Sequence, residues 1–296
     1  MTVQAHRGTA EQVRLRLDVA YDGTDFHGWA AQPGHRTVAG TLLTGLLQLF
    51  GPDTVTGMTV AGRTDAGVHA TGQVCHVDVA ATAWHQPRGP LLRRLARILP
   101  PDLRVTAVTP VPAEFDARFS ARARRYEYRV SDAPYGVDPL RRRDTLVWRR
   151  PLDLARLNAA AAGLVGEHDF AAYCRHKPQS TSVRTVRRLW WRQDPAGAYV
   201  ATAEADAFCQ SMVRSLVGAM LAAGDGSRPP QWPASLLSRR ERAGEVHVVG
   251  PHGLTLVAVE YPAPEDWAAQ AARTRRRRVP LVLGQPAPPL GTGQQD

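Results

Sequence analysis

The chain has 296 residues, 44% of them hydrophobic, so it can bury one large core or two cores of ordinary size. Its 37 Lys and Arg residues outnumber 27 Asp and Glu residues, which favours a polyanionic partner, nucleic acid before an anionic membrane surface. No apolar run approaches the roughly 20 residues that a membrane span needs, and the opening residues lack the apolar core of a secretory signal. We therefore expect a soluble cytoplasmic protein with no membrane partner.

The first half of the chain is predicted to mix strands with short helices. Period-two alternation indicates strands, and apolar residues at helical spacing indicate helices. In chain order these are a strand within 13–23 that runs into a turn at 22–23, a helix at 38–50 capped by Thr37, a strand at 73–79, a basic helix at 91–99 and a strand at 103–108.

The second half repeats this mixture of strands and helices. Its predicted elements are a strand at 123–130, a helix at 152–165, a hairpin of strands at 186–193 and 198–205 around Gly197, a helix at 208–223 and a strand at 254–261. Crossover helices are too few for a doubly wound parallel sheet. We therefore predict an α+β fold with antiparallel-rich sheets flanked by helices, divided into subdomains at 13–112 and 113–264.

The remaining residues, 265–296, hold an arginine run and a Pro/Gly/Gln-rich end. A disordered, solvated tail is favoured here over an ordered RNA-binding element. The three cysteines, Cys75, Cys174 and Cys209, are odd in number, widely spaced and without a C-x-x-C pair. We expect three reduced, mostly packed thiols, and neither a disulfide framework nor a thiolate zinc site.

The stretch AGRTDAGVHATGQV, residues 61–74, combines an arginine and an aspartate with three glycines and a histidine. No lysine follows the glycines as in a phosphate-binding loop, and G-x-G-x-x-G is absent, so a nucleotide cofactor has no support. A metal site would need more ligands than Asp65, His69 and His76 at suitable spacing. We therefore expect no cofactor and no metal.

The sequence allows two interpretations of Asp65. It can belong to a simple turn in which its side chain hydrogen-bonds its own backbone. The neighbouring glycines, however, let the backbone approach a ligand closely, and Arg63 offers a planar fork suited to a phosphate or to the face of a base. On a basic protein, such a loop is a place where nucleic acid can meet one carboxylate.

Several segments, in a fixed order, resemble the TruA family of tRNA pseudouridine synthases. The segment AGRTDAGVH at 61–69 is nearly identical to the family's signature, in which the aspartate is the nucleophile. The other matching segments are YDGTDFHGW (21–29) with QP (32–33) and RTV (36–38), FDARFSARARRYEYRV (115–130), GEHDF (166–170), STSVRTV (180–186), SMVRSLVGAML (211–221) and GLTLVAVEYP (253–262). The resemblance extends over about 13–262, which makes it very specific.

This resemblance implies a fold and a reaction. The family has two related α+β subdomains with the active-site cleft between their sheets, and forms a symmetric homodimer in which one tRNA contacts both protomers. Its members isomerise uridine to pseudouridine at positions 38, 39 and 40 of the tRNA anticodon arm, without a cofactor. The aspartate that matches Asp65 acts as a covalent nucleophile or as a base toward the sugar, and the sequence does not separate these mechanisms.

Arg214 matches the family arginine that pairs with the catalytic aspartate. A nearby cation favours the ionised form of a carboxylate that burial would otherwise protonate. Helical spacing alone leaves a second reading, because Gln210, Ser211 and Gly218 share the face of Arg214, and this face would then look into solvent.

Tyr126 resembles the family tyrosine that lies against the target base. An aromatic ring gives a flipped uracil a stacking surface worth roughly 1–3 kcal/mol. Alternation places Tyr126 and Tyr128 on one face of a strand, so core packing of both rings is the competing interpretation. By the same resemblance, Arg63 fills space near the displaced base or grips its phosphate, and a structural salt link is the alternative.

Further arginines are plausible phosphate contacts, as RNA read by its shape tolerates dispersed contacts. They lie in the helix at 91–99 and in the runs 141–143, 149–150 and 187–188. Three positions depart from the family pattern: Ala30 stands where glutamine is usual, and Ala96 and Asp206 stand where asparagine is usual. These departures concern local RNA contacts and leave Asp65, Tyr126 and Arg214 intact.

Two other functions stay open at this stage. The chain can be an RNA-binding or chaperone protein that kept the fold and charge but lost the chemistry. It can also be a glycosidase that uses the same carboxylate to remove a base.

Overall fold

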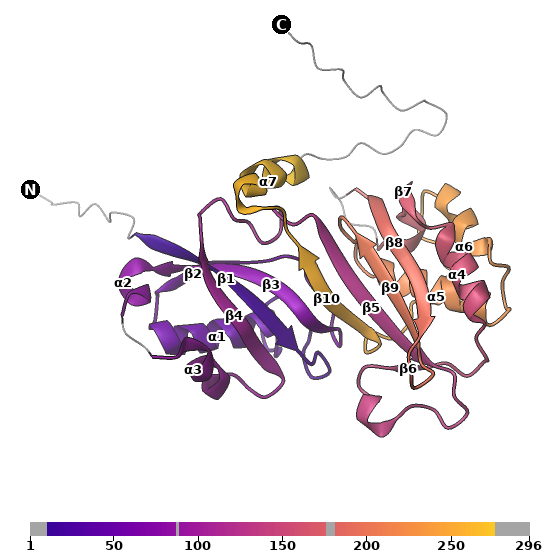
Figure 1. Ribbon diagram of the computed structural model, residues 1–296, viewed down its shortest axis with the longest axis horizontal. Helices are drawn as coiled ribbons and strands as arrows, with labels where there is room; N and C mark the ends of the chain where they lie inside the picture. The colour runs from indigo at the N-terminus through magenta and orange to yellow at the C-terminus, as the bar shows by residue number, and fades with distance from the viewer. Residues whose placement is uncertain (1–10, 87–88, 176–180, 276–296) are drawn as a thin grey trace, which may run out of the picture.

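The computed structural model describes residues 11–86, 89–175 and 181–275. The described strands form one sheet in the order β4-β1-β3-β10-β5-β9-β8-β7, with β2 paired to β3 and β6 paired to β5. Figure 1 shows α1, α2 and α3 beside the strands at one end of this sheet and α4, α5 and α6 at the other end. The predicted α+β class is confirmed.

The N-terminal half is built on three long antiparallel strands. Its elements are β1 (Gln12–Tyr21), α1 (Val38–Phe50), β2 (Val55–Val60), β3 (His69–Ala80), α2 (Ala81–Trp84), α3 (Leu91–Ile98) and β4 (Leu103–Val111). Strand β1 pairs with β3 on one side and with β4 on the other. The predicted cap of α1 is present, since the Thr37 side chain accepts a hydrogen bond from Gly40 N. Fully buried Leu42 and Leu46 fix this helix in the core.

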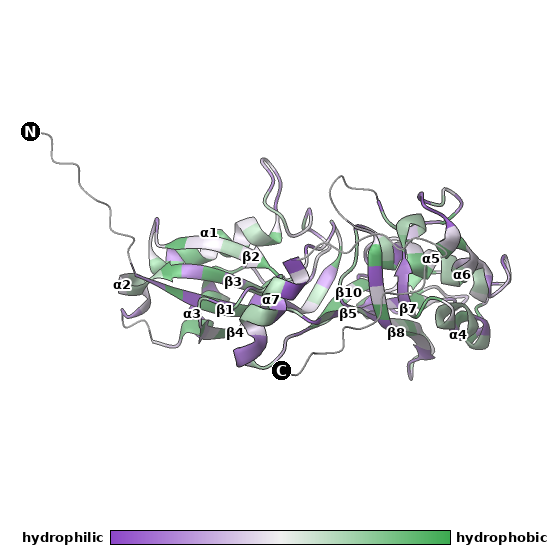
Figure 2. Ribbon diagram, turned by 90° about the horizontal axis from the view of Figure 1, so that it is seen from above, coloured by the Kyte–Doolittle hydropathy of each residue, from purple (hydrophilic) through white to green (hydrophobic). Residues whose placement is uncertain are grey.

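The C-terminal half adds a second set of strands, which are antiparallel to one another except for β6, parallel to β5. Its elements are β5 (Ala123–Ser131), β6 (Leu146–Val147), α4 (Leu154–Ala162), β7 (Gly166–Asp169), β8 (Val183–Gln193), β9 (Tyr199–Ala205), α5 (Met212–Gly224), α6 (Trp232–Ser235), β10 (Leu254–Glu260) and α7 (Trp267–Arg275). Helix α5 is buried over most of its length. Figure 2 shows the molecule elongated along the sheet, with α1–α3 toward one end, α4–α6 toward the other and α7 near the middle.

Strand β10 joins the two halves into a single sheet. It runs parallel to β3, with Thr255 opposite His69, and antiparallel to β5, with Leu256 opposite Tyr126. The sequence patterns predicted separate sheets, because alternation marks a strand without revealing its neighbour. The predicted boundary at residue 112 falls between β4 and β5, and the division into two related subdomains stays a prediction.

Two predicted boundaries are wrong for local reasons. The helix predicted to begin at 208 begins at Met212, because the preceding residue, Ser211, has a left-handed backbone with φ of 64°. The tail predicted to be disordered from 265 begins with the helix α7. Its Trp267 is buried against the ring of Phe115, and its carbonyl accepts a hydrogen bond from Ser120. Residues 276–296 of the predicted tail lie outside the described residues.

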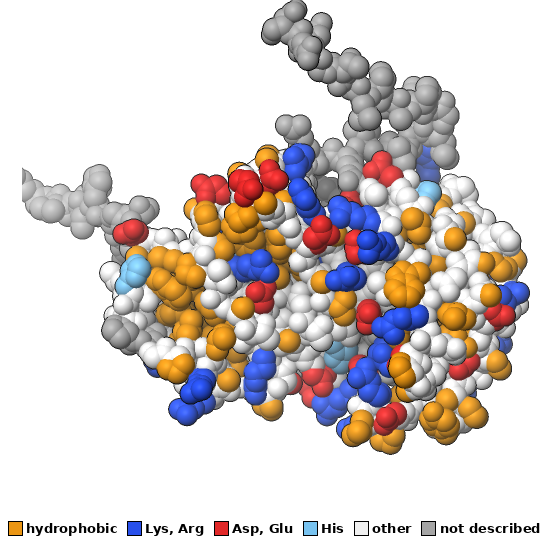
Figure 3. All heavy atoms as spheres, in the orientation of Figure 1, with side chains coloured by type: hydrophobic (Ala, Val, Ile, Leu, Met, Phe, Trp, Pro, Cys, Tyr) orange, Lys and Arg blue, Asp and Glu red, His pale blue; other side chains and the backbone are white. Residues whose placement is uncertain are grey.

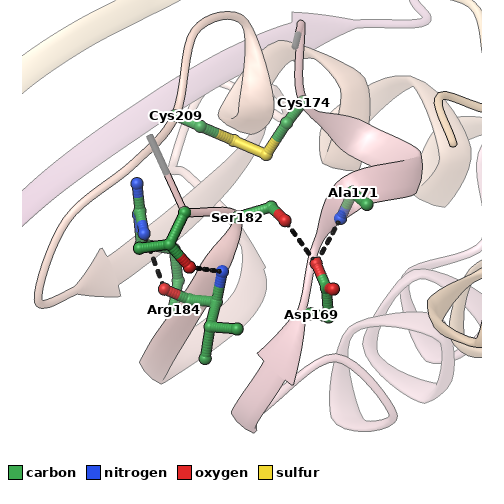
Figure 4. The surroundings of a disulfide bond; sticks show 8 residues. Asp169, Ala171, Cys174, Ser182, Arg184 and Cys209 are labelled. Atoms are coloured by element: carbon green, nitrogen blue, oxygen red, sulfur yellow. Dashed lines mark hydrogen bonds between the residues drawn. A yellow bond between two sulfur atoms is a disulfide. The ribbon is translucent and has the colours of Figure 1, made fainter. Parts of the chain in front are cut away.

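The expectation of three reduced thiols is also wrong. Cys174 and Cys209 form a disulfide with a Cα–Cα distance of 5.6 Å, whereas Cys75 is free and buried. The two segments are adjacent because Arg175 N donates a hydrogen bond to Gln210 O. Figure 4 shows the disulfide near Asp169, at the end of β7, and Ser182, immediately before β8. The sequence did not predict this pairing, because the two cysteines are 35 residues apart and belong to no cysteine motif.

No helix in the described part of the chain is long and apolar enough to cross a membrane.

The disulfide predicts a redox-dependent stability. Because a crosslink restricts the unfolded chain, Cys209→Ser should lower the free energy of unfolding by about 2–4 kcal/mol under oxidising conditions. Urea unfolding with and without dithiothreitol measures this effect. The reduced wild type should match the reduced variant, and a wild-type stability that reductant leaves unchanged would contradict the crosslink.

Candidate active site

Asp65 lies in the loop between β2 and β3. The loop's main chain is held from several sides: Gln73 donates from Nε2 to Gly62 O at 2.8 Å, and Trp29 N donates to Thr64 O at 3.1 Å. Asp65 O accepts a hydrogen bond from Val68 N at 3.2 Å. The carboxylate of Asp65 is therefore carried on a fixed backbone and keeps 35% of its side chain exposed.

A buried polar cluster supports this loop from beneath. The hydroxyls of Tyr21 and Thr64 lie 2.8 Å apart, and Gln73 donates to Tyr21 at 3.3 Å. Burial raises the pKa of Tyr21 to about 12, so this phenol stays neutral at physiological pH. Satisfied networks of this kind rigidify the backbone that they contact.

The segment YDGTDFHGW, residues 21–29, wraps around the same loop. At Gly28, which has φ of 85°, a Cβ atom would lie only 2.8 Å from Thr64 O. At Gly23 it would lie 2.0 Å from Val68 O. Both positions therefore require glycine, because any larger residue would push the Asp65 loop away.

Arg214 comes from the opposite half of the sheet, on the first turn of α5. Its Nη1 lies 3.7 Å from Asp65 Oδ2, and its Nε donates to Val249 O at 2.7 Å. Its side chain is 18% exposed. The structure thus brings together the two charged residues that sequence analysis paired, and the reading in which Arg214 simply faces solvent is wrong. At 3.7 Å the contact is a charge pair rather than a hydrogen bond.

The segment at 249–251 closes the site between these two residues. Arg214 holds the carbonyl of Val249, and the Tyr128 hydroxyl donates to Gly250 O at 2.7 Å. A Cβ atom at Gly67 would come within 2.9 Å of Pro251, so this segment also touches the Asp65 loop. The same short segment therefore fixes the arginine and borders the aspartate.

Tyr126 and Tyr128 have different surroundings, although both are buried. Within the described residues Tyr126 Oη has no hydrogen-bond partner, whereas Tyr128 Oη is bound to Gly250. The Tyr126 ring meets Phe208 edge-on at 5.2 Å, and a Cβ atom at Gly62 would lie 3.9 Å from its hydroxyl. Tyr126 therefore borders the Asp65 loop, whereas Tyr128 braces the 249–251 segment.

Burial raises the pKa of Tyr126, the neighbouring Tyr21 and Asp65 act in the same direction, and the positive charge of Arg124 opposes them. The phenol is therefore a neutral group beside the carboxylate, able to offer a ring face and a hydroxyl but not a phenolate.

Arg63 is exposed on the same loop as Asp65. In the described part of the chain its guanidinium forms no ion pair or hydrogen bond, so the structural salt link considered for it is absent there. Its charge is available to a partner at the site.

Several arginines expected to meet phosphates already have acidic neighbours. Arg141 pairs with Asp144 at 2.7 Å, Arg143 with Asp22 at 3.0 Å, Arg150 with Asp225 at 3.7 Å and Arg187 with Glu260 at 3.5 Å. All four arginine side chains are exposed, and ion pairs at the surface contribute little to stability. Figure 3 shows Lys and Arg side chains grouped over the middle of one face of the molecule.

Of the three departures from the family pattern, Asp206 has a defined role. Its Oδ1 accepts hydrogen bonds from Thr185 N at 3.0 Å and from Ala207 N at 2.8 Å. An asparagine oxygen would accept the same two bonds, so the substitution preserves this turn. Ala96 is exposed on α3 and Ala30 is partly exposed.

Sequence reasoning missed several residues that shape the site. Tyr21, Gln73 and Phe208 gave no pattern that pointed to Asp65. Arg124 was detectable, because alternation along β5 places it on the same face as Tyr126.

The arrangement combines one partly open carboxylate, one guanidinium and one neutral phenol. No group of three or more His, Cys, Asp or Glu side chains in the described residues could hold a metal ion. A carboxylate in these surroundings can attack an electrophilic carbon or accept a proton from a bound molecule.

Known proteins with similar sequences show the family of this chain. A family model described as tRNA pseudouridine synthase matches residues 160–262. The protein named tRNA pseudouridine synthase A from Frankia casuarinae is 55% identical over 90% of this chain and 96% of its own length. Proteins of the same name from Streptomyces griseus and Mycobacterium leprae are 54% and 48% identical, over 90% and 91% of this chain and 94% and 96% of their own lengths. With this identity along nearly its whole length, the chain belongs to the tRNA pseudouridine synthase A family.

Proposed function

We propose that this chain is an isomerase that converts uridine to pseudouridine in tRNA, with Asp65 as its central catalytic residue. The observation that carries the proposal is the 3.7 Å contact between Asp65 and Arg214. The two residues come from opposite halves of the molecule and meet near Tyr126. The relatives match nearly the whole chain, and their names support the same reaction.

The reaction breaks the bond between ribose C1′ and uracil N1 and joins C1′ to uracil C5. The hydrogen on C5 leaves to water, and N1 gains one, so atoms balance without an oxidant or an energy source. Asp65 either attacks C1′, forming a covalent ester that later releases the sugar, or removes a proton from the sugar. Both routes use the Asp65 carboxylate, which Arg214 contacts at 3.7 Å.

Tyr126 and Arg63 have distinct roles in this proposal. The Tyr126 ring supports the flipped uracil by stacking, which offsets part of the energy needed to take the base out of its helix. Arg63, unpaired within the described residues, fills the space that the base leaves or grips its phosphate.

The finer parts of the proposal follow the family resemblance. The enzyme acts in the cytoplasm on positions 38, 39 and 40 of the anticodon arm, and a homodimer binds one tRNA across both protomers. Mapping pseudouridine in tRNA from cells with and without the gene should show loss confined to these positions. Sedimentation equilibrium should give twice the chain mass of 32.3 kDa, and a monomer bound to tRNA would reject the dimer.

Asp65→Asn should abolish isomerisation while tRNA binding persists, because the amide has nearly the same shape but cannot act as nucleophile or base. Release of tritium from tRNA labelled at uracil C5 measures the reaction, and filter binding measures affinity. Undiminished release would reject the role of Asp65.

Two measurements on the wild-type protein, tritium release and the mass of the RNA product, separate this enzyme from the two alternatives. A silent RNA-binding protein would show no release in the wild type. A glycosidase would lower the mass of the RNA by the lost base, whereas isomerisation leaves the mass of the RNA unchanged.

Tyr126→Leu should slow the reaction by roughly 5- to 150-fold, the equivalent of about 1–3 kcal/mol of lost stacking. Tyr126→Phe keeps the ring and should stay close to the wild-type rate. Single-turnover tritium release measures both, and thermal unfolding confirms that each variant folds. Tyr135→Leu, at an exposed ring, serves as the matched control. Equal rates for Tyr126→Leu and Tyr135→Leu would contradict a stacking role.

A further inference from the structure

Arg124 is a buried arginine close to the site, two residues before Tyr126 on β5. The burial pattern of β5 places both side chains on the covered face of the sheet, while Arg125 between them is exposed. Arg124 is only 6% exposed. In the described part of the chain no carboxylate lies within ion-pair distance of its guanidinium, which is unusual for a buried charge, although the charge of Asp206 favours the cationic form.

Main-chain carbonyl groups take the place of a counterion. Arg124 donates from Nε and Nη2 to Ala61 O at 3.3 and 2.8 Å, and from Nη1 to Asp206 O at 2.7 Å. Its Nη2 also donates to Arg118 O at 2.5 Å. Burial lowers the pKa of Arg124, so retaining the charge here carries a cost that these hydrogen bonds offset.

The carbonyls of Ala61 and Asp206 lie at the starts of the two loops that lead to Asp65 and Arg214. Ala61 directly follows β2 and begins the loop that carries Asp65. Asp206 directly follows β9 and begins the loop that leads to Arg214 on α5. One guanidinium therefore holds the starting point of both segments whose side chains meet at 3.7 Å.

Only arginine can make this set of bonds. Its planar guanidinium has five donors in a fixed fork, whereas lysine has one nitrogen at the end of a flexible chain. Removing the fork would leave the buried carbonyls without partners and release the two loops from each other.

We propose that Arg124 is a positioning residue that sets the distance between Asp65 and Arg214 by holding the two loops together. This inference rests on the proposed function, because its effect is read in the isomerisation rate. Arg124 acts through the backbone of both loops and does not itself touch the reacting atoms.

The test compares Arg124→Lys and Arg124→Ala with Arg125→Lys and Arg125→Ala, the matched changes on the opposite face. Arg124→Lys should lower the single-turnover rate of tritium release by about 100-fold, the typical effect of displaced catalytic groups. Its affinity for tRNA should be unchanged, since no phosphate contact is removed. Both Arg125 variants should keep the wild-type rate.

Chemical rescue distinguishes positioning from a general loss of structure. Ethylguanidinium should raise the rate of tritium release by Arg124→Ala by about tenfold or more, because it can bind between the carbonyls where the Arg124 guanidinium lies in the wild type. It should not raise the rate of Asp65→Asn, whose missing group is a carboxylate.

Three outcomes would overturn the inference. These are a wild-type rate for Arg124→Lys, a parallel loss of rate and tRNA affinity without rescue, and unfolding of both Arg124 variants in a thermal melt, which would make the role purely structural. A wild-type protein that releases no tritium would instead reject the proposed function.

Discussion

The contact between Asp65 and Arg214 is the constraint on which the site depends, because its two members belong to different halves of the sheet. A charge pair at 3.7 Å is sensitive to small shifts, since neither side chain is held by a direct hydrogen bond to the other. The fold meets this demand indirectly. It fixes the backbone on each side, through Gln73 and Trp29 on the aspartate loop and through Val249 beside the arginine.

Buried polar groups hold much of the backbone around the site in place. The cluster of Tyr21, Thr64 and Gln73 satisfies its members internally, and Arg124 satisfies three carbonyls at once. Such groups cost free energy to bury, and an apolar core would stabilise the chain equally well. Their advantage is direction, because a hydrogen bond fixes an angle and a distance that apolar packing leaves variable.

The sequence predicted the elements of this fold better than their arrangement. Alternation and helical spacing located α1 and most of the strands, and the resemblance singled out Asp65 and Arg214. Strand partners were not predictable, since the residues of β10 contain nothing that specifies pairing with β3. The disulfide between Cys174 and Cys209 and the bonds of Arg124 depend on long-range packing for the same reason. The helix α7 was not predicted because its charged and small residues are typical of a disordered tail. The one tryptophan that anchors the helix did not change that prediction.

The position of β10 has a consequence for biosynthesis. Residues 254–260 occupy the middle of the sheet, yet they leave the ribosome about 190 residues after the loop that carries the carboxylate. The emerging chain therefore leaves the parts of β3 and β5 that pair with β10 uncovered until β10 has emerged. Closure of the sheet is therefore a long-range event, and β3 and β5 are joined only when β10 pairs with both.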